Sequence, residues 1–214
     1  MRQAPAEFFG TVIVADPNIL KALIRASRET GAAEWNGVRA GRAVVDLTAA
    51  DLSQAALADF NLARADLSDA RLFNADLTGA DLSHARLARA DLRRANLSNA
   101  YLTGADLTGA NLQGANLVDT NLDEACLEGV QAAGAHFVGA NLVNADLENA
   151  SLRCANLKFA NVKGARMKGA DVDEADLTGV DFEPQTLKEL VNFAGAIIRT
   201  KSLVRVQGSG RQRL

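Results

Sequence analysis

The sequence predicts an all-β solenoid, an elongated stack of coils whose interior is filled by side chains. Three observations support this prediction. From Leu47 to Phe182, every fifth residue is leucine at 22 of 28 positions. The residue two places earlier is alanine at 23 of 28 positions, and the residue between them is Asp or Asn at 19 of 28. A helix does not fit, because five residues turn through about 500° and the apolar stripe would spread around its axis.

Each five-residue unit predicts a short extended edge followed by a corner. In the unit Ala75–Gly79, Ala75 and Leu77 share one face of a strand, and Asp76 points the other way. The two residues after each leucine are frequently Ser, Thr, Gly, Asn or Asp, and these residues favour turns. One edge cannot bury its leucine alone, so successive coils must stack.

Charge patterning indicates four edges in each coil. Stacked residues lie about 4.8 Å apart, where opposite charges attract and like charges repel. At a spacing of 20 residues we count nine opposite pairs and two like pairs, whereas spacings of 15 and 25 favour like pairs. The predicted ladders are Asp51–Arg71–Asp91, Asp66–Arg86–Asp106, Asp146–Arg166, Glu148–Lys168, Arg153–Asp173 and Lys163–Glu183. Four edges a coil give about seven coils and a rod of roughly 34 Å.

These A(D/N)LXX units resemble the pentapeptide-repeat family over about two thirds of the chain. The resemblance implies a right-handed quadrilateral parallel β-helix with Leu and Ala pointing inward. The segment Trp35-Asn36-Gly37-Val38-Arg39 also resembles the entry found before many such repeats. Near Val130 and Ala132 the large and small inward residues look exchanged, and Phe60 takes an alanine position.

The flanks predict short helical caps at both ends. We expect an N-terminal strand and helix cap over 1–42, the β-helix over 43–183, a C-terminal helix and dimerisation element over 184–206, and a disordered tail over 207–214. The first helix is expected over 16–30, with Asp16 as N-cap, Gly31 as stop, and Ile19, Leu20, Leu23 and Ile24 on its apolar face. The second is expected from Pro184 to about Ala194, followed by a short strand or intermolecular contact at Ile197 and Ile198. Either both flanks act as solubility caps, or one end mediates dimerisation, for which the candidate contacts are Leu187, Leu190 and Val191, pointing inward.

The sequence predicts neither an enzyme nor a cofactor or metal site, because a rod filled by Leu and Ala has no concavity for a substrate. His84 and His136 point outward on different coils, and Cys126 and Cys154 lie on different faces. Tyr101, Phe73 and Phe159 are expected outside as isolated aromatics.

The first function predicted is therefore a rigid rod that binds a protein partner. The candidate surface is an apolar exposed strip, Val118, Val138 and Val143, with an acidic group at Asp119, Asp123, Glu124 and Glu128. The alternative comes from the resemblance: some family members mimic duplex DNA, bind DNA gyrase or a related type II topoisomerase, and protect against drugs or toxins. The sign of the charge fits, since residues 43–184 carry a net charge of −10 within a chain of −3. Basic clusters, and Phe at only two of the 28 leucine positions, argue against it.

Direct binding of nucleic acid or membrane is disfavoured. The basic C-terminal residues Arg199, Lys201, Arg205, Arg211 and Arg213 have no aromatic platform or basic groove. The longest apolar run, Phe8–Ala15, is too short to cross a bilayer and lacks the flanks of a signal peptide. We therefore expect a cytoplasmic protein.

Overall fold

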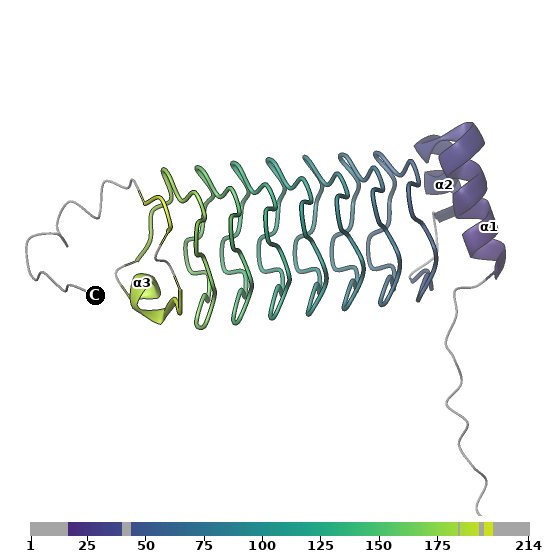
Figure 1. Cartoon of the computed structure of the whole chain (residues 1–214). Helices are drawn as coiled ribbons and strands as arrows, with labels where there is room; N and C mark the ends of the chain where they lie inside the picture. Colours follow the sequence, from purple (N-terminus) through teal and green to yellow (C-terminus); the bar gives the residue numbers. More distant parts are fainter. Residues whose placement is uncertain (1–16, 40–43, 184, 193–194, 199–214) are drawn as a thin grey trace, which may run out of the picture.

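The computed structural model describes residues 17–39, 44–183, 185–192 and 195–198 of the 214-residue chain. Helix α1 (Pro17–Arg25), a π-helical turn η1 (Ala26–Thr30) and helix α2 (Ala32–Arg39) gather at one end of a row of stacked coils. The short helix α3 (Thr186–Glu189) lies at the other end (Figure 1). The chain thus forms an elongated rod with helices at its two ends.

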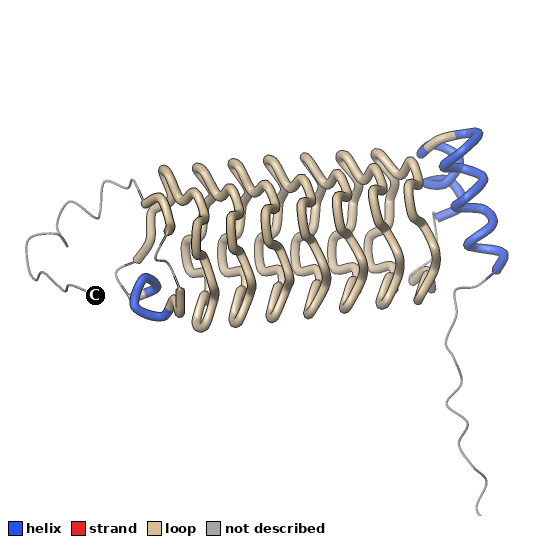
Figure 2. Tube along the Cα trace, in the orientation of Figure 1, coloured by secondary structure: helices blue, strands red, loops and turns tan. Residues whose placement is uncertain are grey.

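The coils are joined by parallel bridges with a register of 20 residues. Twenty-three bridges, from Asp46↔Asp66 to Asn156↔Asp176, link residues 20 apart, as the charge pattern predicted. The prediction of short strands was wrong, because in the described residues each edge contributes one isolated bridged residue (Figure 2). Two of every five residues lie in a turn, so the extended edge between two turns is too short to form a continuous β-strand.

A repeated β-turn forms each corner. In the first, the amide of Ala50 donates to the carbonyl of Leu47 at 3.0 Å, and Ala49 adopts a φ of 55°. The amide of Thr48 donates to Oδ1 of Asp46 at 3.0 Å, and this local bond explains the preference for Asp or Asn before leucine. A positive φ recurs at the second residue of the described turns, where ten glycines relieve its steric cost.

The interior consists of the predicted leucine and alanine columns. Every inward leucine from Leu47 to Leu177 is at most 2% exposed. Val130 and Ala132 are both fully buried, consistent with their exchanged positions. Thr120 takes an alanine position, and its buried hydroxyl donates to the carbonyl of Leu97 at 2.7 Å. The rod is therefore filled, and its functional groups must lie outside.

The predicted first helix is present as α1 followed by η1, and it ends at Gly31 with a φ of 78°. Ile19 and Leu23 are buried, while Leu20 and Ile24 pack partly buried against the core. The predicted N-cap Asp16 and the segment Phe8–Ala15 lie outside the described residues.

Helix α2 contacts the open edge of the first coil with its side chains. The indole Nε1 of Trp35 donates to the carbonyl of Asn61 at 2.7 Å, and Oδ1 of Asn36 accepts from the Asn61 amide at 2.7 Å. Further along the stack, the same two backbone groups bond to a preceding coil, as when Asp66 bonds Val45 and Leu47. Trp35 and Asn36 thus take the place of a missing coil, and Trp35 also stacks on Phe60 at 6.3 Å.

The C-terminal helix is shorter than predicted. It ends at Glu189, and Leu190 is extended, with φ −68° and ψ 138°. Leu190 is buried and Leu187 is half-buried, but Val191, predicted to point inward, is 66% exposed because the extended chain turns it outward. Asn192 and Ile197 then form bridges to Asp171 and Asp176, at a spacing of 21 residues. The predicted disordered tail over 207–214 lies outside the described residues.

Candidate interaction surface

The register of 20 residues sorts the outer side chains into four walls. Each wall comprises one column of bridged residues and the two turn residues that follow each of them. Walls 1 to 4 begin at Asp46, Asp51, Ala56 and Asn61, and each continues at every twentieth residue. Side chains 20 apart are therefore neighbours.

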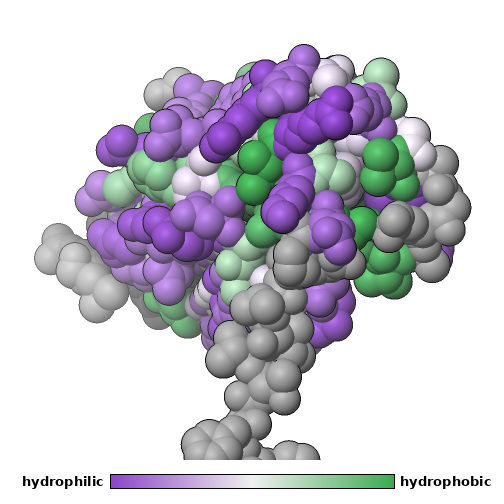
Figure 3. Space-filling model, turned by 90° about the vertical axis from the view of Figure 1, so that its right-hand side faces the viewer, coloured by the Kyte–Doolittle hydropathy of each residue, from purple (hydrophilic) through white to green (hydrophobic). Residues whose placement is uncertain are grey.

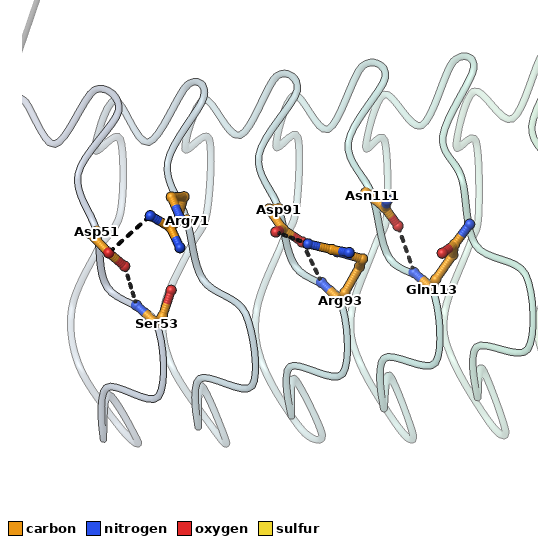
Figure 4. Close-up of polar contacts among 7 residues, drawn as sticks. All are labelled: Asp51, Ser53, Arg71, Asp91, Arg93, Asn111 and Gln113. Atoms are coloured by element: carbon orange, nitrogen blue, oxygen red, sulfur yellow. Dashed lines mark hydrogen bonds and ion pairs between the residues drawn. The ribbon is translucent and has the colours of Figure 1, made fainter.

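Walls 1 and 2 hold most of the ion pairs. Arg71 lies 3.2 Å from Asp51, and Arg86 lies 3.1 Å from Asp66. Arg166 contacts both Asp146 and Glu148, so the predicted Glu148–Lys168 pair is replaced by Glu148–Arg166 at 2.5 Å. Figure 4 shows the wall-2 contacts of Asp51, Asp91 and their neighbours. These walls carry twelve acidic and eight basic residues, and six of their seven arginines form ion pairs.

Two of these pairs lower carboxyl pKa values. Hydrogen bonds from Arg89, at 2.8 and 2.6 Å, hold the pKa of Asp69 below its usual value. Arg93 does the same for Asp91 with two bonds of 2.7 Å, and its guanidinium also lies over the ring of Phe73, 5.6 Å from the centroid. Phe73, predicted as an outward aromatic, is half-buried.

Walls 3 and 4 carry fewer basic residues than walls 1 and 2. They carry three of the eleven basic residues of the coils: Arg64, Lys158 and Lys163. They carry nine of the acidic residues: Asp59, Asp76, Asp81, Asp119, Asp123, Glu124, Asp176, Asp181 and Glu183. Lys158 lies 3.0 Å from Asp176, and this ion pair offsets part of the acidic charge of these walls. One side of the rod is therefore acidic.

The valine strip is less exposed than predicted. Val118 and Val138 stack at one corner of wall 3, and Val143 lies at the next corner, on wall 4. All three are half-buried, because each lies between the turns of neighbouring coils. They do not form an exposed apolar strip.

The four predicted acidic residues are spread around the rod. Asp119 is on wall 3, Asp123 and Glu124 are on wall 4, and Glu128 is on wall 1. Asp123 is half-buried and the other three are exposed. The hydrogen bond to Glu148 and the charges of Asp146 and Glu148 raise the pKa of the Arg166 guanidinium, and the charge of Glu128 adds a smaller part. Asp119, Asp123 and Glu124 lie at two adjacent corners of one coil, and Glu128 lies on the wall that follows.

Large exposed apolar side chains occur singly along the described chain: Val38, Val44, Tyr101, Phe159, Val191 and Ile197. The end-on view shows that the helical end is mostly hydrophilic, with small apolar patches between polar groups (Figure 3). Val191 and Ile197 belong to the C-terminal segment in which a dimer contact was predicted.

A hollow of about 450 Å³ opens on wall 4 near α2, and the sequence analysis did not identify it. Its lining includes Asp59, Asp81, Tyr101 and the amides Asn36 and Asn61. The signal was present, since Asn61, Asp81 and Tyr101 are 20 apart and form consecutive bridges.

The histidines and cysteines do not converge. His84 and His136 are exposed, and both cysteines are free thiols. The thiol of Cys154 donates to Glu174 at 3.2 Å, and this bond raises its pKa, which disfavours the reactive thiolate. Over the described residues, no group of three His, Cys, Asp or Glu is arranged to hold a metal ion. None of the described helices has the length and apolarity needed to cross a membrane.

The chain is a repeat solenoid, because its five-residue units stack with a 20-residue register around an interior filled by side chains. The chain belongs to the pentapeptide repeat family: the model described as pentapeptide repeats matches eight copies. The matches cover residues 46–83, 70–109, 100–137, 133–169 and 160–183. Members of this family form quadrilateral β-helices and are generally structural or interaction proteins.

Solved structures of the family resemble the chain. A pentapeptide repeat protein, Rfr23, from the cyanobacterium Cyanothece 51142 is 35% identical, with a TM-score of 0.32, over 57% of this chain. The chain spans 64% of that protein's length. QnrB1, a plasmid-mediated fluoroquinolone resistance protein, is 14% identical, with a TM-score of 0.37, over 78% of this chain and 96% of its own. A pentapeptide repeat protein of the Arabidopsis thaliana thylakoid lumen is 28% identical, with a TM-score of 0.28, over 55% and 78%. No match was found among curated proteins. Family membership rests on the repeat match, since these TM-scores are below 0.5.

Proposed function

We propose that the protein is a non-catalytic, cytoplasmic rod that binds a protein partner through walls 3 and 4. The observation that carries this proposal is the uneven charge of the rod. Walls 3 and 4 hold nine acidic and three basic residues, a net charge of −6, whereas walls 1 and 2 hold twelve and eight, a net charge of −4. Six of the seven arginines of walls 1 and 2 are engaged in ion pairs. A face with a net negative charge attracts and orients a basic partner surface.

The architecture supports this role. We infer that the coil winds right-handed over about seven turns in residues 43–183, and that the helices at both ends cap it. Residues 1–42 would form the N-terminal cap, because Trp35 and Asn36 satisfy the open edge at Asn61. A rod with capped ends remains rigid.

Photo-crosslinking in cells tests the proposal. A photoreactive residue replaces Glu124 on wall 4, and a matched variant carries it at Gln113, an exposed residue of wall 2. We expect a discrete adduct of one protein from position 124 and none from position 113. Equal adducts from both walls, or none from either, would contradict the proposal.

The second candidate is a DNA mimic that binds a type II topoisomerase and gives protection or self-resistance to a drug or toxin. The acidic walls favour it, because duplex DNA presents a continuous negative surface. We expect micromolar protein to inhibit or protect gyrase supercoiling, and Glu124→Lys to weaken this more than Gln113→Lys. Folded protein without effect on gyrase would exclude this candidate and leave the first intact.

We also propose a homodimer contact within residues 184–206. Exposed Val191 and Ile197 support it, while the buried Leu190 and half-buried Leu187 would hold the segment in place. Light scattering should give a dimer for the full chain and a monomer for Val191→Asp. A monomeric full chain would end this proposal.

A further inference from the structure

The hollow on wall 4 combines two carboxylates with an exposed aromatic ring. Bridges place Asp81 next to Asn61 on one side and next to Tyr101 on the other. Tyr101 is 55% exposed, and the structure leaves its ring open to solvent beside the hollow. The lining of the hollow therefore includes acidic side chains and an aromatic ring.

The second carboxylate of the hollow is that of Asp59, which has room there because Gly79 has no side chain. Asp59 belongs to the previous coil, but its side chain lies over Gly79, and a Cβ at that position would be 2.5 Å from Oδ1 of Asp59. Gly79 is two residues before Asp81, so the Asp59 side chain reaches the coil that carries Asp81. In the described part of the chain, Asp59 makes no ion pair, and Asp81 accepts one bond from the Ser83 amide at 3.0 Å.

Arg39 compensates this charge only in part. Its side chain is buried, and its guanidinium donates to the carbonyl of Ala63. Burial lowers the pKa of Arg39, and the charge of Asp81 opposes that shift. Arg39 thus interacts with Asp81, while the hollow is lined by two carboxylates and no basic side chain.

The same molecule shows how such groups hold an arginine. On wall 2, the Arg93 guanidinium forms two bonds to Asp91 and lies over Phe73. The hollow offers the same pair of partners, a carboxylate and an aromatic face, with no basic side chain of its own lining it. A planar guanidinium satisfies both partners at once, whereas an ammonium group is a point charge.

We propose that this hollow binds the guanidinium group of an arginine side chain from a partner protein. Asp59 and Asp81 accept its N–H groups, and Tyr101 stacks on its face. The inference deepens the proposed function, on which it rests, by naming the chemistry that the partner presents. The volume of about 450 Å³ admits one such side chain together with water.

The chain contains a matched control three coils further on. Asp119 lies over Gly139 as Asp59 lies over Gly79, but Asn141 and Asn161 replace Asp81 and Tyr101. That position has one carboxylate and no ring. It should bind a guanidinium group only weakly.

The test is a titration of isotope-labelled full chain with N-acetyl-argininamide, followed by NMR. We expect saturable shifts at the Gly79 and Ser83 amides, with a dissociation constant on the order of 1 mM. N-acetyl-lysinamide should bind more weakly, and the uncharged citrulline analogue should not bind. Asp59→Asn and Tyr101→Ala should each weaken binding about threefold to fivefold, and Asp119→Asn should leave it unchanged.

Equal shifts with the lysine probe would overturn the assignment to a guanidinium group. Shifts spread evenly over walls 3 and 4, or unchanged binding in Asp59→Asn, would overturn the site itself. The probe needs no partner protein, so a failed titration with positive crosslinks from Glu124 would leave the interaction rod standing.

Discussion

Removing the Asn36 side chain should open the first coil without disturbing the centre of the rod. Asn36 accepts from the Asn61 amide at 2.7 Å and donates to the carbonyl of Asp59 at 3.2 Å. Each such bond contributes about 1 kcal/mol net, so Asn36→Ala should cost about 2 kcal/mol. That energy corresponds to roughly a 30-fold change in a local opening equilibrium.

Hydrogen exchange measured residue by residue is the appropriate assay, because a stacked coil contacts only its neighbours. The Leu57 and Leu62 amides donate to the second coil at 2.7 Å, and the Leu112 amide makes the equivalent bond near the middle. In Asn36→Ala, exchange should accelerate about 30-fold at Leu57 and Leu62 and stay unchanged at Leu112. Gln113→Ala, an exposed substitution, should change none of the three. Unchanged exchange in the first coil would refute the view that Asn36 replaces a missing coil.

Three further predictions concern the interior, a corner and the acid response. Leu112→Ala should lower the free energy of unfolding in urea by about 2–5 kcal/mol, because Leu112 is fully buried; a loss below about 1 kcal/mol would argue against a filled core. Gly79→Ala and Gly129→Ala should each lower the free energy of unfolding by about 1 kcal/mol, because both glycines have a positive φ. Only Gly79→Ala should also weaken argininamide binding, since a Cβ at Gly79 meets Asp59 and a Cβ at Gly129 meets nothing. The pKa of Asp69 is lowered from 3.8, so the stability contributed by its pair with Arg89 is present above about pH 4 and is lost as pH falls through the lowered pKa. Urea midpoints at pH 7 and pH 3 should therefore differ less in Arg89→Gln than in the unmodified chain, and an identical difference would contradict that linkage.

The repeat and its register could be predicted because they depend on local chemistry that recurs at every unit. The leucine and alanine of each unit indicate the buried positions, and the Asp or Asn between them indicates the local hydrogen bond of the turn. Four ion pairs that the spacing of 20 predicted are present: Asp51–Arg71, Asp66–Arg86, Asp146–Arg166 and Arg153–Asp173. Because the repeat is unbroken, these weak preferences recur in every unit, and together they identify the fold and its register.

The ends and the wall-4 hollow were harder to predict, because they depend on single contacts between distant segments. Nothing local in Trp35 or Asn36 indicates that their side chains bond to the Asn61 backbone, 25 or 26 residues away. The C-terminal helix stops at Glu189 because the chain returns to the coil, and residue propensity does not report that pairing. The hollow arises where the Asp59 side chain crosses to the next coil over Gly79.

Pulsed dipolar EPR between Gln54 and Glu174 tests the 20-residue register most directly. Both residues are exposed turn residues of wall 2 and are 120 residues apart, with Cys126 and Cys154 replaced by serine to leave two labels. Six coils at about 4.8 Å predict a narrow distribution with a backbone separation of about 29 Å. A register of 15 residues would give about 38 Å. A peak there, or a broad distribution, would contradict the assignment of side chains to walls, and with it both the acidic face and the arginine site.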